Sequence, residues 1–191
     1  MYLFLDTETS GLPKRWNAPL TDLRNWPRIV QLAWILCDER GDEQERDCRL
    51  IAPDGWTIDP GATRRHRITT AHAKKHGEPI AAAIAKFSAA AARGGTVVAH
   101  NIEFDLPIVG AEFLRLGQVD PLTTLRRRCT MRETTKVCRL PGRYGFKWPT
   151  LDELHRHLFG VGFEDAHDAL ADCDACRRCF LKLEGLTPGG E

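Results

Sequence analysis

The sequence predicts a single α/β domain built on a mixed sheet. Three strand-like segments lie near the N-terminus, and helices then alternate with short strands, which is the element order of an α/β domain. The chain of 191 residues can bury a substantial core, and its 42% hydrophobic and 28% charged residues are ordinary for a globular protein. No apolar run approaches the roughly 18 residues of a membrane span. We therefore expect a cytoplasmic protein, with one domain over residues 1–186 and a flexible tail over 187–191.

The first three strands are expected to pair in an antiparallel manner. Residues 1–5 form a continuous apolar run, as in a strand that is buried on both faces. Residues 29–37 and 47–51 are two further strand-like segments, joined by a polar turn that contains Gly41. The stretch 9–27 holds three prolines and is expected to be a loop.

Helices and short strands alternate in the next part of the chain. Residues 79–93 are rich in alanine and predict a helix, which ends at two glycines. Residues 96–99 are a short strand with β-branched side chains, and 104–116 predict a second helix that ends at a glycine. Residues 129–131 are expected to add one more short strand.

Two helices are predicted near the C-terminus. Thr150 and Glu153 have the spacing of a capping box, in which the threonine accepts a backbone N–H and the glutamate reaches back. The helix that follows is expected to end at Gly160. The last helix is expected to run from about residue 167 to 183.

Two acids follow the first apolar run. Because side chains alternate along a strand, Asp6 and Glu8 are expected on the same side, at the carboxyl end of a central strand. Such close carboxylates repel each other unless a cation lies between them. For this pair of acids in isolation, two solvated acids at a strand end are the preferred interpretation.

Three further polar residues follow the later elements. Asp105 lies near the first turn of a helix, where an acid is also favoured by the helix dipole alone. His167 and Asp172 flank the start of the last helix, so both can face the sheet if His167 lies on the entering loop. A histidine at that place is also a common helix cap. Four carboxylates suit Mg²⁺ or Mn²⁺, and a histidine can accept a proton near neutral pH.

The three motifs resemble those of the DEDDh 3′-to-5′ exonucleases, the superfamily of the epsilon proofreading subunit of bacterial DNA polymerase III and of ribonuclease T. The motifs occupy residues 6–12, 100–105 and 167–172, and the similarity covers about 2–183, including 29–33 and 147–151. The resemblance implies a ribonuclease-H-like fold, with a mixed five-stranded sheet flanked by helices. It also implies hydrolysis of single-stranded nucleic acid from the 3′ end to nucleoside 5′-monophosphates. DNA is favoured over RNA as the substrate, but the choice stays open because no motif fixes a contact to the 2′-hydroxyl.

The resemblance implies a role for each site residue. Asp6, Glu8 and Asp172 would hold the metal ion that activates water, and Asp6 with Asp105 would hold a second ion. His167 would be the general base. The residues that match positions around the terminal nucleotide are Thr9, Gly11, Leu12, His100, Asn101 and Phe104.

A basic segment suggests how the strand is held. Residues 126–147 hold eight basic residues and one acid, a net charge of +7, so the remainder of the +1 chain carries −6. This segment could follow the phosphates of the incoming strand, or it could be a solvated basic face. Trp16, Trp26 and Tyr144 lie in expected loops, where they either stack on bases or pack their own loops.

Several alternatives remain open from the sequence. Cys173, Cys176 and Cys179 have a spacing that invites a metal-cluster interpretation, but an apolar helical stripe makes core packing the preferred one. The chain ends soon after its third motif, without the C-terminal extension by which the proofreading subunit that it resembles binds its polymerase, so we expect at most weak polymerase association. A monomer and a homodimer both stay open, because ribonuclease T-like relatives pair and proofreading subunits need not. A nucleic-acid-binding or polymerase-accessory module with secondary nuclease activity is the alternative function.

Overall fold

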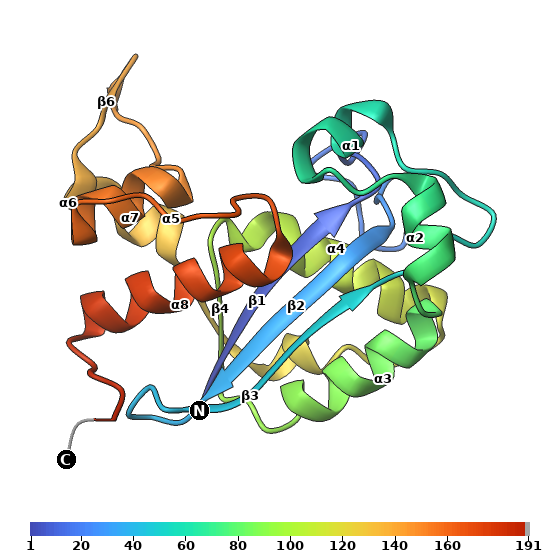
Figure 1. Cartoon of the computed structure of the whole chain (residues 1–191), viewed down its shortest axis with the longest axis horizontal. Coiled ribbons are helices and arrows are strands. Elements are labelled where there is room, and N and C mark those ends of the chain that lie inside the picture. The colour runs from blue at the N-terminus through green and yellow to red at the C-terminus, as the bar shows by residue number, and fades with distance from the viewer. Residues whose placement is uncertain (190–191) are drawn as a thin grey trace.

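The computed structural model describes residues 1–189, and its core is a mixed five-stranded sheet in the order β3-β2-β1-β4-β5 (Figure 1). β1 (Tyr2–Thr9), β2 (Ile29–Cys37) and β3 (Glu43–Leu50) pair in an antiparallel manner. β4 (Thr96–Ala99) and β5 (Arg126–Cys129) continue the sheet in parallel with β1. The predicted fold class is confirmed, with β1 at the centre. The last two residues of the predicted 187–191 tail lie outside the described residues.

Helices cover both faces of the sheet. α3 (Ile80–Ala91) and α4 (Ile102–Arg115) pack on one face, where Leu3 and Leu5 share a core with Phe87 and Phe113. α8 (Ala169–Glu184) crosses the other face (Figure 1). On that face Phe4 packs against Phe180. Because side chains alternate along β1, its residues are divided between the two cores.

Two short helices between β3 and α3 were not predicted. α1 (Pro60–His66) begins with Pro60 after Asp59, whose side chain accepts a hydrogen bond from the Gly61 amide. α2 (Thr70–His76) is capped in the same way by Thr69. Each helix has seven residues, too few to display a helical hydrophobic period. The N-cap residues Asp59 and Thr69 were therefore the only sequence signals for these two helices.

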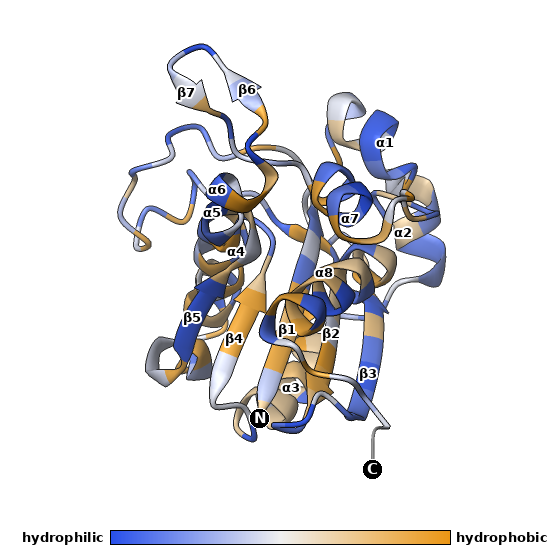
Figure 2. Ribbon diagram, turned by 90° about the vertical axis from the view of Figure 1, so that its left-hand side faces the viewer, coloured by the Kyte–Doolittle hydropathy of each residue, from blue (hydrophilic) through white to orange (hydrophobic). Residues whose placement is uncertain are grey.

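The segment between β5 and the C-terminal helices is irregular. It contains α5 (Thr130–Glu133), α6 (Thr135–Cys138) and a hairpin of β6 (Pro141–Gly142) and β7 (Gly145–Phe146), and a 3₁₀ turn at Pro121–Thr124 precedes β5. The predicted strand at 129–131 is wrong, because the strand ends at Cys129 and a helical turn follows. Figure 2 shows the reason: β5 is a hydrophilic edge strand, so it has no apolar run to mark it.

The capping box at the start of α7 (Leu151–Phe159) is confirmed. The Glu153 amide donates to Thr150 Oγ1 at 3.2 Å, and the Thr150 amide donates to Glu153 Oε2 at 2.8 Å. Gly160 ends the helix with a positive φ of 77°. The other predicted helices are confirmed with ends shifted by one to two residues, while β1 and β3 extend four residues beyond the predicted 1–5 and 47–51.

The cysteines of α8 belong to the hydrophobic core. Cys173 and Cys176 pack against the sheet, and Cys179 packs with Cys138 and Leu154. Among residues 1–189 these thiols form no group of converging metal ligands, which favours the core-packing interpretation. No helix in the same range is long and apolar enough to span a membrane.

Candidate active site

A cavity of about 1510 Å³ lies at the carboxyl end of β1, and every site residue predicted from the sequence lines it. These residues are Asp6, Glu8, Thr9, Gly11, Leu12, His100, Asn101, Phe104, Asp105, His167 and Asp172. They come from β1, from the start of α4 and from the entry to α8, so the fold brings the three sequence motifs together.

Asp6 and Glu8 occupy alternate positions of β1, on the same side as Phe4 and therefore towards α8. Burial raises the pKa of Asp6 well above its ordinary value, and the nearby Asp105, Asp172 and Glu8 raise it further. Burial also raises the pKa of Glu8 to about 8, with Asp172 as the next cause. Both carboxylates therefore resist ionisation unless positive charge is brought to them.

Asp105 joins the second motif to the first. Its Oδ1 accepts hydrogen bonds from the Thr7 amide at 3.1 Å and from the Thr7 hydroxyl at 2.7 Å, and the residue is only 2% exposed. Burial raises the pKa of Asp105 to about 7, although these hydrogen bonds lower it. The helix-cap interpretation of Asp105 is therefore unnecessary, because its carboxylate is bound to β1. Thr7 was missed from the sequence, although it stands between the two acids.

Asp172 and His167 lie at the entry to α8. Asp168 caps the helix by accepting from the amides of Leu170 and Ala171, and Asp172 follows in the first turn. His167 precedes the helix with a positive φ of 73°, and its amide donates to Asp172 Oδ2 at 3.3 Å. Its ring Nδ1 lies 4.0 Å from the same oxygen.

The electrostatic environments of these two residues differ. Burial raises the pKa of Asp172 to about 6. Burial, followed by the charges of Arg65 and Arg67, lowers the pKa of His167. The imidazole is thus favoured in its neutral form, and its side chain remains 41% exposed to solvent.

The donor set fits a divalent cation. Glu8, His167 and Asp172 each offer a ligand atom, and these atoms lie within 4.8 Å of one another. Within residues 1–189, no lysine or arginine forms an ion pair with any of the four carboxylates. Crowded, buried oxygens without a cationic partner are the environment that Mg²⁺ or Mn²⁺ stabilises.

One wall of the cavity is apolar. The Leu12 side chain is 73% exposed, and the Trp16 and Phe104 rings lie with centroids 6.0 Å apart. Thr9 Oγ1 donates to the Gly11 carbonyl at 2.7 Å, which fixes the turn before Leu12.

The second motif supplies two further wall residues. Both ring nitrogens of His100 are engaged, one with Thr130 Oγ1 at 3.0 Å and the other with the Pro149 carbonyl at 3.1 Å. Asn101 precedes α4 with a positive φ of 71°. His100 therefore joins two walls of the cavity.

The loop after Leu12 is tied to α4. The buried Glu112 carboxylate accepts from Arg28 at 2.8 Å and from Arg115 at 2.9 Å. Arg115 also donates to the carbonyls of Leu23 and Trp26 at 2.7 Å. The Trp26 ring is buried, and its indole N–H donates to Pro19, so this tryptophan packs its own loop.

The residues of the basic segment 126–147 differ in what they contact. Arg128 pairs with Glu133 and Glu184, both at 2.8 Å, so its charge is already matched. Arg132 lies over the Trp148 ring, which lines the cavity. Tyr144 is 89% exposed on the hairpin and is not part of the cavity wall.

The cavity also includes residues that sequence reasoning did not select. Arg64, Arg65 and His66 arrive on α1, the helix that was not predicted. The Asp59-Pro60 pair before the three basic residues was the available signal.

The sequence matches the RNase_T family, described as exonuclease, over residues 3–180. No curated protein gives a significant match. Among solved structures, the chain is similar to E. coli exonuclease I in complex with a dT13 oligonucleotide, with a TM-score of 0.77 and 24% identity over 95% of this chain and 40% of that chain.

Two further structures of the same enzyme are similar. The complex with a dA16 oligonucleotide has a TM-score of 0.77 and 23% identity, over 97% of this chain and 41% of that chain. The zinc-bound form of the complex with single-stranded DNA has a TM-score of 0.76 and 24% identity, over 96% and 40%. The chain thus spans about 40% of the length of these proteins, and the likeness establishes a common fold.

Proposed function

The chain belongs to the RNase_T family of exonucleases, within the DEDD superfamily, and we propose that it hydrolyses single-stranded nucleic acid from the 3′ end. The products are nucleoside 5′-monophosphates, and DNA is preferred to RNA. The observation that carries the proposal is the convergence of Asp6, Glu8, Asp105, Asp172 and His167 in one cavity. The oligonucleotide complexes of the similar exonuclease I support DNA as the substrate. The family match supports one exonuclease domain over residues 1–186.

Four carboxylates would hold the metal ions. Asp6, Glu8 and Asp172 would bind one divalent ion, and Asp6 with Asp105 would bind a second. When bound, Mg²⁺ or Mn²⁺ supplies positive charge that stabilises the negative charge developing on the phosphodiester. The absence of cationic partners for these carboxylates within residues 1–189, together with their raised pKa values, supports this assignment.

His167 is the general base of the proposed reaction. Its imidazole is half-exposed, so water can reach it, and its lowered pKa keeps the ring neutral and able to accept a proton. The amide hydrogen bond to Asp172 holds the residue at the edge of the carboxylate cluster. His167 then accepts the proton of the water that attacks the phosphorus atom.

The apolar wall binds the terminal nucleotide. Leu12 is exposed and lies beside the Gly11 turn, so it can wedge against the last base. Phe104 and Trp16 supply aromatic faces on which bases stack without regard to sequence. This wall supports single-stranded ends as the substrate, because the bases of a duplex are already paired and stacked on their neighbours.

The proposal is tested with 5′-labelled DNA and RNA oligonucleotides in Mg²⁺, each with a free or a blocked 3′ end. We expect stepwise shortening of the free DNA, slower shortening of RNA, and none in chelator. Asp6→Ala and Asp172→Ala should abolish turnover, and His167→Ala should lose about 10²–10⁴-fold in rate. Asp54→Ala, which removes an exposed acid outside the cavity, is the matched control.

Two results would contradict the proposal. One is full activity of the Asp6 or Asp172 variant in a clean preparation. The other is tight oligonucleotide binding in chelator with no turnover in Mg²⁺, which would favour the binding-module alternative.

A further inference from the structure

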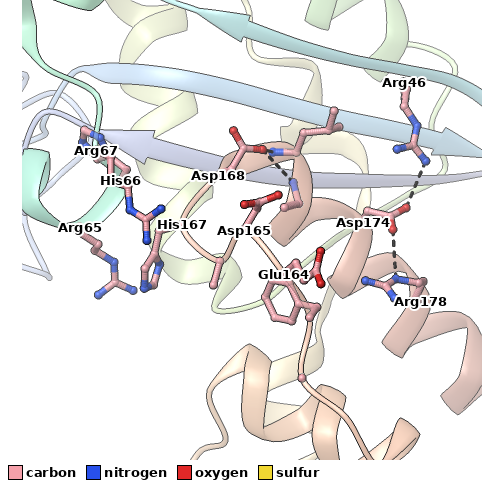
Figure 3. A pocket seen from close by; sticks show the side chains of 15 residues that line it. Arg46, Arg65, His66, Arg67, Glu164, Asp165, His167, Asp168, Asp174 and Arg178 are labelled. Atoms are coloured by element: carbon pink, nitrogen blue, oxygen red, sulfur yellow. Dashed lines mark hydrogen bonds and ion pairs between the residues drawn. The ribbon is translucent and has the colours of Figure 1, made fainter.

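A second hollow, of about 730 Å³, adjoins the active-site cavity at His167 (Figure 3). The end of α1 and the loop that leads into α8 form its walls, and Arg65 and His66 line both spaces. The hollow is therefore open to a substrate that is bound beside His167.

The arginines of this hollow are of two kinds. Arg46 and Arg178 both pair with Asp174, at 3.2 Å and 3.1 Å. Arg65 and Arg67 are exposed, and within residues 1–189 neither side chain forms an ion pair or a hydrogen bond. Figure 3 shows these two arginines gathered around His167 at one end, with the paired arginines at the other. Among the described residues that line the hollow, the arginines that form no ion pair are the two beside His167.

The backbone conformation of Arg67 argues against a stabilising role for this residue in the fold. Arg67 ends α1 with a positive φ of 63°, a conformation that glycine adopts at the least cost. Its side chain forms no hydrogen bond or ion pair within residues 1–189 that would offset this cost. Folding alone therefore gives no reason for a long cationic side chain at this position.

The positive charge of Arg65 acts on two carboxylates of the candidate active site. Burial raises the pKa values of Glu8 and Asp172, and the positive charge of Arg65 opposes both shifts. Yet Arg65 is bonded to neither carboxylate, so its guanidinium N–H groups remain free for another acceptor.

We propose that Arg65 and Arg67 form a phosphate-binding subsite beside His167, which holds the non-bridging oxygens of a substrate phosphodiester. The guanidinium group donates two parallel hydrogen bonds to phosphate, which fixes orientation as well as charge. The inference rests on the proposed exonuclease function and names additional residues that contact its substrate. The phosphate has two sources: that of the reacting nucleotide, or that of its neighbour in the strand.

The competing explanation is structural. Cations in the last turn of a helix interact favourably with its dipole, so Arg65 could serve only to stabilise α1. A ligand contact and a structural role differ in what their loss changes: the first changes substrate binding, and the second changes the melting temperature.

The test compares Arg65→Ala, Arg65→Lys and Arg67→Gly with Lys75→Ala. Lys75 is an exposed cation on α2 that lines neither space, so its loss controls for net charge. Steady-state rates in Mg²⁺ are measured on oligothymidylate and on the p-nitrophenyl ester of thymidine 5′-monophosphate, which has a single phosphate. Melting temperatures are measured for every variant.

We expect kcat/KM to fall about tenfold or more in Arg65→Ala and in Arg67→Gly, the usual effect of losing a charge-assisted hydrogen bond. Arg65→Lys should recover part of the loss, because lysine keeps the charge without the paired geometry. Arg67→Gly should melt at or above the wild-type temperature, and Lys75→Ala should match wild type in both measurements. A loss on both substrates assigns the contact to the reacting phosphate, and a loss on oligothymidylate alone assigns it to the neighbouring one.

Wild-type kinetics in Arg65→Ala and Arg67→Gly, with Asp6→Ala inactive, would overturn the subsite and leave the exonuclease function intact. If the wild-type protein itself shows no turnover, fluorescence anisotropy of oligothymidylate in chelator replaces the rates. Weaker binding by the two arginine variants than by Lys75→Ala then supports the subsite, and equal binding, or none by the wild type, overturns it.

Discussion

Gln31 and Asp168, 137 residues apart, fasten the entry of α8 to the second strand of the sheet. Gln31 Nε2 donates to Asp168 Oδ2 at 2.9 Å, and the Ala169 amide donates to Gln31 Oε1 at 3.0 Å. Asp168 lies between His167 and the helix that carries Asp172. A strand residue outside the cavity thus determines where two residues of the candidate site lie.

Replacing Gln31 by leucine should therefore affect both stability and catalysis. Two hydrogen bonds to a partly buried helix entry are lost, which should cost about 1–2 kcal/mol in the free energy of unfolding. Turnover should fall as well, because His167 and Asp172 lose their anchor. Urea denaturation and rates on oligothymidylate measure the two effects. Gln44→Leu, at an exposed position of β3, should leave both unchanged, and an active, fully stable Gln31→Leu would contradict this account.

Divalent cations should stabilise the protein more at high pH than at low pH. The pKa values of Asp172, Asp105 and Glu8 are raised to about 6, 7 and 8, so the metal-free folded state prefers their protonated forms. Stability from these groups is present below pH of about 4 and is lost as pH rises through the raised values. In chelator the melting temperature should therefore fall over that range.

Excess Mg²⁺ should reverse this loss. Saturation to about 100 times the dissociation constant contributes roughly 2.7 kcal/mol. Thermal denaturation at pH 5 and pH 8, with Mg²⁺ or chelator, measures the effect. Asp105→Asn should weaken both the pH dependence and the response to Mg²⁺. An equal response at both pH values would contradict the assignment of the carboxylates.

His100 should make the fold sensitive to acid. Burial lowers its pKa from 6.5 to about 4, although its hydrogen bond to the Pro149 carbonyl raises it. Between these values the unfolded state binds the proton and the folded state does not, so stability from the neutral ring is lost as pH falls from 6.5 towards 4. The full loss is about 3 kcal/mol at 1.36 kcal/mol per pKa unit. Urea unfolding of His100→Gln and wild type should converge with acidification, and parallel curves would refute the explanation.

Trp16 should contribute to substrate binding and little to stability. The side chain is 60% exposed and lies against Phe104 in the cavity wall. A lost stacking contact is worth about 1–3 kcal/mol, so Trp16→Ala should raise KM for single-stranded DNA by about 5- to 160-fold. Trp16→Phe should keep most of the affinity. If Trp16→Ala instead lowers the melting temperature without changing KM, the ring only packs its own loop.

The parts of the fold that were predictable are those with a strong local pattern. β2 and β4 have the predicted bounds, because both are apolar runs ended by turn residues. The capping box of Thr150 and the shared side of Asp6 and Glu8 follow from fixed local geometry. These signals do not depend on what packs against them.

The parts that were missed depend on partners distant in the sequence. β5 is a charged edge strand that pairs with β4, and its own residues show no apolar run that would predict a strand. α1 and α2 are too short to display a helical hydrophobic period, and the proposed role of Arg65 depends on the end of α1 lying beside the loop that leads into α8. Likewise, nothing near Thr7 in the sequence indicates that its hydroxyl binds Asp105, 98 residues away.

The positive φ of His167 has a consequence for protein engineering. Glycine adopts this conformation more readily than histidine, which is held there at a cost of roughly 1 kcal/mol. His167→Gly would relax the backbone and open a gap beside Asp172, on the half-exposed side of the cavity. Such a gap suits chemical rescue, in which imidazole or another small base diffuses in from the buffer and takes over the proton transfer. The rate would then follow the basicity of the added compound, so an investigator could choose the strength of the base.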